Sequence, residues 1–203
     1  MRYKWLNKKN HSKIILFFNG WGMDESVVSH LKTEDYDVLV FYDYNNLNTD
    51  FDFVSLNTYT EKYLVAWSMG VMIATLFDIQ YNFKTAINGT LKPIDDKYGI
   101  PTKIYDLTLK GFSQKGAERF IKNMYKEDCK YPEITREFDN QKSELQALTG
   151  YNANLDFSYD RVIISSDDKI IPTKNQITFW RKEPNLDSGH APFNHFNSWG
   201  DLL

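Results

Sequence analysis

Ser68 stands where one apolar run ends and another begins, in the sequence Ala-Trp-Ser-Met-Gly at residues 66–70. The run before it predicts a buried strand and the run after it, residues 71–77, predicts a buried helix. A nucleophilic serine needs such a sharp strand-to-helix turn, with small residues two positions before and after it so that strand and helix can approach closely. Ala66 and Gly70 meet this requirement, which makes Ser68 a candidate nucleophile. The motif alone also fits an ordinary strand–helix turn.

A serine nucleophile needs a base, and the chain has four histidines: His11, His30, His190 and His195. His190 follows Gly189 and precedes Ala-Pro-Phe, which places it in a loop after the last predicted sheet elements. A histidine in such a loop can reach over the edge of the sheet. His195 is the alternative base. It can also be interpreted as a capping or packing residue near the last helix.

The base needs a carboxylate that holds its tautomer, and two aspartates directly follow the apolar run at residues 161–165. We favour Asp168, because its spacing to Pro172 recurs in folds with this chemistry, and interpret Asp167 as a turn residue. The order Ser68, Asp168, His190 is the order of the catalytic residues in α/β-hydrolases. Each residue alone is weak evidence for catalysis. The three residues in this order, each at a predicted strand end, together indicate a catalytic triad.

An oxyanion formed at Ser68 needs N–H donors. Met69, the residue after the nucleophile, supplies one at the start of the predicted helix, where the helix dipole also favours negative charge. The sequence Asn-Gly-Trp-Gly at residues 19–22 follows the first apolar run, so Trp21 is placed to supply the second. The glycines beside it let the backbone approach a substrate. Without Ser68, a simple glycine-rich turn would be the better interpretation.

The elements that must position these residues are short apolar runs at residues 14–18, 38–42, 63–67, 85–88 and 161–165. They predict strands buried on both faces, as in a parallel sheet. Strands that alternate with helices predict an α/β fold, a mostly parallel central sheet flanked by helices. Ligand sites in such sheets lie beyond the carboxyl ends of the strands. The polar clusters at residues 19–22, 68–70 and 167–168 are all expected there. Asp24 is expected to cap a short helix after the first strand.

Residues 101–150 differ from the rest, because apolar residues alternate there with Lys and Arg and no strand is indicated. We expect a helical lid insertion over the active edge of a single domain, residues 1–203. Between Pro101 and Lys130, seven basic and four acidic residues give this stretch a net charge of +3 and leave −6 for the remainder. The candidate binding residues for an acidic partner are Lys110, Lys115, Arg119 and Lys122, although a charge run is commonly a solvated face.

Composition limits the classes of function. The chain has 203 residues, 42% hydrophobic and 25% charged, with a net charge of −3, so no overall positive charge favours nucleic-acid binding. One cysteine, Cys129, excludes an internal disulfide and a cysteine-based zinc site, which fits a cytoplasmic protein. The basic N-terminus is not followed by the apolar run of a secretory signal, and no stretch is long enough to span a bilayer. No metal or organic cofactor is expected.

Together, residues 18–23, 66–70, 88–94 and 190–193 resemble the BioG family of pimeloyl-acyl-carrier-protein methyl ester esterases of biotin synthesis. The Gly-Trp-Gly, Trp-Ser-x-Gly and His-Ala-Pro-Phe elements are also similar to those of the BioH esterases. The string Asn-Gly-Thr-Leu-Lys-Pro-Ile at residues 88–94 is the most BioG-like feature, since general hydrolases do not need it. Two departures are Ala66 in place of the first glycine and a short segment between Pro172 and His190.

The resemblance implies a small α/β-hydrolase with a helical lid that cleaves the methyl ester of pimeloyl-acyl carrier protein and releases methanol. It implies Ser68 as nucleophile, His190 as base, Asp168 as its partner, and Trp21 and Met69 as oxyanion donors. The partner would be the acidic carrier protein, bound by basic lid residues. The alternatives are a general carboxylesterase or thioesterase of the same fold, or a non-catalytic module that binds an acyl carrier protein.

Overall fold

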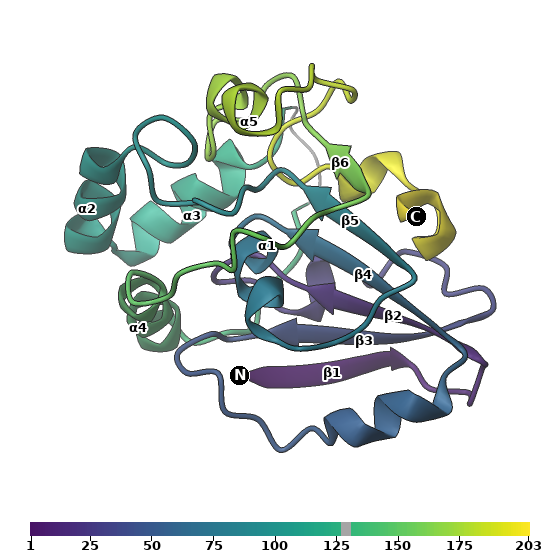
Figure 1. The fold of residues 1–203 in the computed structure, drawn as a ribbon. Helices are drawn as coiled ribbons and strands as arrows, with labels where there is room; N and C mark the ends of the chain where they lie inside the picture. Colours follow the sequence, from purple (N-terminus) through teal and green to yellow (C-terminus); the bar gives the residue numbers. More distant parts are fainter. Residues whose placement is uncertain (127–130) are drawn as a thin grey trace.

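The computed structural model describes residues 1–126 and 131–203 (Figure 1). Cys129, and the charges of Glu127, Asp128 and Lys130, lie outside the described residues. The described strands form a six-stranded sheet in the order β1-β3-β2-β4-β5-β6. In chain order they are β1 (Arg2–Asn7), β2 (Lys13–Phe18), β3 (Tyr36–Tyr42), β4 (Glu61–Trp67), β5 (Phe83–Ile87) and β6 (Arg161–Ile163).

All neighbouring strands are parallel except β1, which pairs antiparallel with β3 at one edge of the sheet. The predicted parallel sheet is therefore confirmed, and β1 is an element that the apolar runs did not predict. Its side chains alternate between exposed and half-buried, with Tyr3 and Trp5 turned to the core. An edge strand with one solvated face lacks the continuous apolar run of the central strands.

The central strands are apolar on both faces because the sheet has a core on each side. Ile14, Leu16 and Phe18 of β2 belong to one buried cluster, while Ile15 and Phe17 belong to the other. This alternation follows from the two-residue period of a strand. The first cluster also contains the helix after β4, and the second contains the C-terminal residues Trp199 and Leu202.

The described α-helices are α1 (Gly70–Ile73), α2 (Thr102–Gly111), α3 (Gln114–Asn123), α4 (Phe138–Leu148) and α5 (Thr173–Trp180). Helices α2, α3 and α4 come between β5 and β6, and Figure 1 shows them gathered at the end of the sheet to which the parallel strands point. They occupy the 101–150 insertion of the sequence. No helix among residues 1–126 and 131–203 is long and apolar enough to cross a bilayer.

Two predicted helices differ from the observed ones in length. The apolar run after Ser68 forms only four residues of α-helix, α1, and then continues as a 3₁₀ helix, Ala74–Leu76. Asp24 does cap a short helix, but this helix is a single 3₁₀ turn, Glu25–Val27. The segment between Pro172 and His190 is short in sequence, and α5 fills its first half.

Candidate active site

Ser68 occupies a strained turn between β4 and α1. Its φ of 56° lies in the left-handed region that side chains rarely adopt, and its N–H donates a 3.0 Å hydrogen bond to Ile87 O at the end of β5. The turn is also crowded, since a Cβ placed on Gly70 would lie 2.2 Å from Phe18 O. Strain and close packing together present the Ser68 side chain at the carboxyl edge of the sheet.

The structure brings Ser68, His190 and Asp168 together from three distant parts of the chain. Ser68 Oγ lies 2.8 Å from His190 Nε2, and His190 Nδ1 lies 2.7 Å from Asp168 Oδ2. All three residues are buried. A carboxylate only accepts hydrogen bonds, so it places the imidazole proton on Nδ1 and leaves Nε2 free to accept from the serine hydroxyl. This arrangement is the one a serine needs in order to lose its proton.

Asp168 is held by four hydrogen bonds. Oδ1 accepts from the backbone N–H groups of Ile170 and Ile171, at 2.9 and 3.0 Å. Oδ2 accepts from Gln176 Nε2 at 2.8 Å as well as from His190. Sequence reasoning missed Gln176, because a glutamine on a helix gives no signal that it is fully buried.

The His190 loop is fixed through its own carbonyl group. His190 O accepts from Trp67 Nε1 at 2.8 Å and from Asn88 Nδ2 at 2.9 Å, and Asn88 Nδ2 also lies 2.7 Å from Ser165 Oγ. Asn88 in turn accepts from Ser165 N–H at 2.8 Å. One buried amide therefore joins the ends of β5 and β6 to the histidine loop, which gives the first residue of the 88–94 string a structural role.

The two alternative residues lie away from this cluster. Asp167 is half-exposed, its N–H donates to Ser188 O, and its carboxylate lies 3.3 Å from Lys169 Nζ. His195 ends a short 3₁₀ helix, Phe193–His195. No hydrogen bond among the described residues joins Asp167 to His190 or His195 to Ser68, so the geometry favours Asp168 and His190.

Trp21 and Met69 both line the cavity that opens beside Ser68. Neither backbone N–H donates a hydrogen bond to another of the described residues. Unpaired buried N–H groups are rare in folded proteins, and two that border one cavity suit an acceptor that arrives with the substrate.

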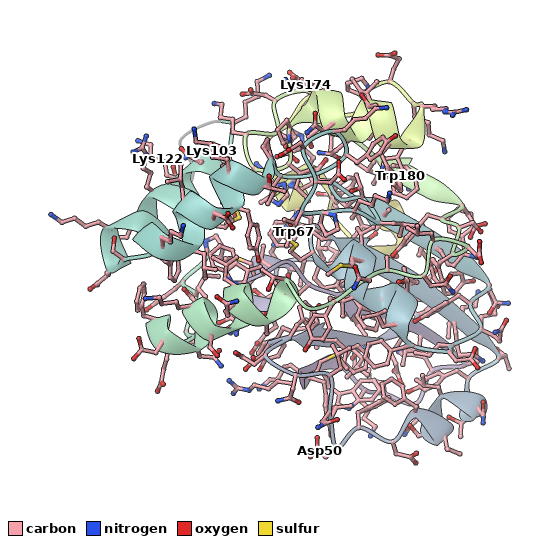
Figure 2. All side chains as sticks on the ribbon, turned by 60° about the vertical axis from the view of Figure 1, so that its left-hand side comes forward. Asp50, Trp67, Lys103, Lys122, Lys174 and Trp180 are labelled. Carbon is pink, nitrogen blue, oxygen red and sulfur yellow. The ribbon has the colours of Figure 1, made fainter. Side chains whose placement is uncertain are left out.

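The cavity has a volume of about 160 Å³ and reaches from Ser68 into the insertion. Its walls are largely apolar, and the insertion contributes Ile104, Tyr105, Phe120 and Leu145. Figure 2 shows Trp67, which also lines it, in the interior between the sheet and the helices. Apolar walls of this kind are complementary to an apolar ligand surface.

Lys110, Lys115, Arg119 and Lys122 are exposed on α2 and α3 and do not line this cavity. Figure 2 shows Lys122 and Lys103 extending outward from these helices. The three α3 residues are spaced so that they share one face of the helix. Lys169 is the basic residue of the described chain that does border the cavity, and the sequence did not single it out.

Within residues 1–126 and 131–203, no group of three or more His, Cys, Asp or Glu side chains converges as a metal site.

The mostly parallel sheet, the strained serine after β4 and the helical insertion before β6 define a protein of the α/β-hydrolase fold. The family model described as the pimeloyl-ACP methyl esterase BioG matches residues 1–202. The chain therefore belongs to the BioG family of esterases, and the predicted resemblance is confirmed.

One solved structure agrees with this assignment, and a second shares the fold. The crystal structure of BioG from Haemophilus influenzae is similar to the chain with a TM-score of 0.89 and 33% sequence identity, covering 100% of this chain and 99% of that one. A lipase-esterase related protein from Clostridium acetobutylicum shares the fold, with a TM-score of 0.58, 12% identity and coverage of 99% and 96%.

A longer relative is the malonyl-[acyl-carrier protein] O-methyltransferase of Bacteroides fragilis, 38% identical over 180 residues. The match takes in 83% of this chain but only 36% of that protein. The BioG-like part is thus one portion of a larger chain in that relative.

Proposed function

We propose that the protein hydrolyses the methyl ester of pimeloyl-acyl carrier protein to pimeloyl-acyl carrier protein and methanol, in biotin synthesis. The observation that carries the proposal is the hydrogen-bonded series Ser68–His190–Asp168, with distances of 2.8 and 2.7 Å. It lies beside a largely apolar cavity lined by Trp21 and Met69, whose backbone N–H groups have no hydrogen-bond partner among the described residues. In this arrangement each residue has a role in acyl transfer.

In the first half of the reaction, Ser68 Oγ attacks the ester carbonyl while His190 Nε2 takes its proton. The oxyanion accepts hydrogen bonds from Trp21 N–H and Met69 N–H, and Asp168 stabilises the imidazolium. The tetrahedral intermediate collapses, the bond to the methoxy oxygen breaks, and His190 gives its proton to the departing methanol. Water then attacks the acyl-enzyme with His190 again as base, which releases the carboxylic acid and restores Ser68.

The cavity supports the proposal that the substrate is a dicarboxylate chain bound to a carrier. Its volume of about 160 Å³ and its largely apolar walls suit a short methylene chain. Each buried methylene contributes about 0.8 kcal/mol, so the apolar walls favour a chain that fills them. The family description and the name of the methyltransferase relative both refer to acyl carrier protein.

The outer surface of α2 and α3 supports the proposal that an acyl carrier protein docks on these helices. Ile104 and Leu107 are 53% and 57% exposed, and Lys110 and Arg119 are exposed near them on the same two helices. A second, shallow cavity between these helices is lined by Leu107 and Arg119. Apolar side chains surrounded by cations are complementary to an acidic carrier protein. Ile104 also borders the main cavity, so a carrier bound here would stand at its entrance.

The test compares Ser68→Ala with the native chain on methyl-pimeloyl-acyl carrier protein. The native chain is expected to release methanol, and the variant to lose activity by at least about 10³-fold, since the nucleophile is gone. Complementation of a biotin auxotroph that lacks its methyl esterase reads the physiological substrate directly. Native chain that leaves the carrier substrate uncleaved, or a Ser68→Ala variant that keeps its activity, contradicts the proposal.

Substrate comparison separates the alternatives. A general carboxylesterase would prefer short p-nitrophenyl esters to the carrier-bound methyl ester, and a thioesterase would cleave the carrier's thioester bond instead. A non-catalytic binding module would retain carrier affinity but would not be labelled at Ser68 by a fluorophosphonate probe.

A further inference from the structure

The turn that carries Trp21 is tied to helix α4 of the insertion. Trp21 Nε1 donates a hydrogen bond of 2.8 Å to Gln141 O, and Gln141 Nε2 donates one of 3.2 Å to Gly22 O. Gly22 has a φ of 75°, so the turn adopts a left-handed conformation at this point. Contacts from α4 therefore determine the shape of a loop that begins at the end of β2.

The innermost contact comes from Glu144, whose side chain is fully buried. Its Oε2 accepts from Gly22 N–H at 3.0 Å, and its Oε1 accepts from Tyr44 N–H at 2.8 Å. Arg136 Nη1 donates to Oε2 at 2.6 Å. One carboxylate thus joins α4 to the Trp21 turn and to the residues after β3, and Figure 1 shows α4 beside the end of that strand.

A carboxylate in this position carries a free-energy cost. Burial raises the pKa of Glu144 above its ordinary value, while Arg136 and the two backbone N–H groups act in the opposite direction. An apolar side chain could pack α4 against the core without that cost, because buried ion pairs are poor sources of stability. The feature that an apolar residue cannot supply is a pair of acceptors for the N–H groups of Gly22 and Tyr44.

Fixing Gly22 N–H fixes the peptide plane that joins it to Trp21, because the peptide unit is rigid. The neighbouring peptide unit carries Trp21 N–H, which has no hydrogen-bond partner among the described residues, and Trp21 lines the cavity. An oxyanion donor must be held in position before the reaction to be effective.

We propose that Glu144 is a positioning residue for ester hydrolysis, which holds the Trp21 turn so that Trp21 N–H points toward the oxyanion. The inference rests on the proposed function of Ser68, and it makes α4 part of the catalytic framework. Glu144 itself does not touch the substrate.

The test is Glu144→Gln, measured on a short p-nitrophenyl ester so that carrier docking does not enter. A glutamine of the same shape has one acceptor oxygen, and its amide group then faces an N–H donor. We expect kcat to fall about 10- to 100-fold, less than the loss caused by deleting an oxyanion donor outright, with KM changed less than about threefold. The Ki of a trifluoromethyl ketone, which forms a tetrahedral adduct at Ser68, is expected to rise in parallel.

Asp43→Asn is the matched control. Asp43 Oδ1 lies 3.3 Å from Arg136 Nη2, in the same buried charge cluster, but among the described residues Asp43 makes no hydrogen bond to the Trp21 turn. Asn tolerates the left-handed φ of 62° at this position. We expect Asp43→Asn to lower the melting temperature and to leave kcat and the inhibitor Ki within about twofold of native, since it leaves the N–H groups of Gly22 and Tyr44 paired.

The inference is overturned if Glu144→Gln keeps native kcat, or if Asp43→Asn lowers kcat as much as Glu144→Gln does. If Glu144→Gln does not fold, Gln141→Ala takes its place, because this half-exposed residue holds the same turn through Gly22 O. A fall of about threefold or more in kcat without a change in KM supports the proposal, and native kcat contradicts it. Loss of all activity in Ser68→Ala, measured alongside, separates failure of this inference from failure of the proposed function.

Discussion

Gln176 Nε2 donates a 2.8 Å hydrogen bond to Asp168 Oδ2, the oxygen that also accepts from His190 Nδ1. Gln176 is fully buried, and its Oε1 has no hydrogen-bond partner among the described residues. An unpaired buried acceptor costs about 1–3 kcal/mol, so this glutamine is retained at a cost to stability. Gln176 Nε2 also donates a 2.8 Å hydrogen bond to Ile171 O, so one buried amide holds both the Asp168 carboxylate and the backbone of the loop that carries it.

Replacing Gln176 with Leu tests whether its hydrogen bond to Asp168 contributes to ester hydrolysis. The variant removes a hydrogen bond to an anion that orients His190, so we expect kcat to fall about 5- to 30-fold, equivalent to about 1–2 kcal/mol of transition-state stabilisation. It removes the unpaired Oε1 but also the hydrogen bond that Gln176 Nε2 donates to Ile171 O, so we expect the protein to lose about 1 kcal/mol of stability and to remain folded. Steady-state kinetics and thermal denaturation of the same preparations check both expectations.

Gln176→Glu is the companion variant, because it places a second carboxylate against Asp168. Repulsion between the two should lower kcat further than Gln176→Leu does. If Gln176→Leu folds and keeps the native kcat, Gln176 does not act through Asp168.

The proximity of Ser68, Asp168 and His190 could be predicted from the sequence. Ser68 and Asp168 each follow an apolar run, and parallel strands bring their carboxyl ends to one edge of the sheet, while the residues around His190 predict a loop that can reach that edge. Gln176 and Glu144 could not be predicted, since both lie on helices where a polar residue ordinarily faces solvent, and burial depends on how the helix packs. Strand β1 was missed for a related reason, because an edge strand shows only a weak alternation of apolar residues. A four-residue α1 was unexpected because an apolar run does not show where α-helix gives way to 3₁₀ helix.

Asn88→Ala is expected to lower both activity and stability. The amide of Asn88 bonds to His190 O, Gly189 O and Ser165, and its φ of 43° is one that asparagine tolerates better than alanine does. Loss of these buried hydrogen bonds should destabilise the fold by about 2–4 kcal/mol and lower kcat, because the His190 loop is no longer held. Urea denaturation and kinetics measure the two effects.

Ser165→Ala is the control variant for Asn88→Ala. It removes one hydroxyl partner of the same amide but leaves both contacts to the histidine loop intact. We expect a loss of stability of about 1 kcal/mol with kcat close to native. Equal losses of kcat in the two variants would show that the contacts of Asn88 to the loop have no specific effect on His190.

Charge reversal on α3 tests the proposed carrier surface. Arg119→Glu combined with Lys115→Glu should raise KM for methyl-pimeloyl-acyl carrier protein about tenfold and leave the short ester unaffected, since neither residue lines the main cavity. The native KM should also rise with salt, as screening weakens a charged interface. Lys4→Glu, an exposed change on the edge strand β1, is the control and should leave KM near native. Equal effects of all these reversals would indicate only a general charge requirement.

Gly70→Ala tests the close approach beneath the nucleophile. Its Cβ would lie 2.2 Å from Phe18 O and 2.6 Å from Asn19 O, both backbone atoms, so α1 or the end of β2 must shift. We expect destabilisation of about 3 kcal/mol or more, together with loss of activity, because overpacking against backbone cannot be relieved by a rotamer change. Gly111→Ala, at the end of α2, is the control.

A Cβ at Gly111 meets no atom within 4 Å, so this change should be neutral or should stabilise the protein by up to about 1 kcal/mol, through helix propensity. Chemical denaturation of both glycine variants beside the native chain gives the two free energies, and a fluorophosphonate probe reports whether Ser68 is still reactive. If Gly70→Ala proves as stable as Gly111→Ala and is labelled at the native rate, the strand and helix do not need the close contact. The strained φ of Ser68 would then have to be maintained by its hydrogen bond to Ile87 O.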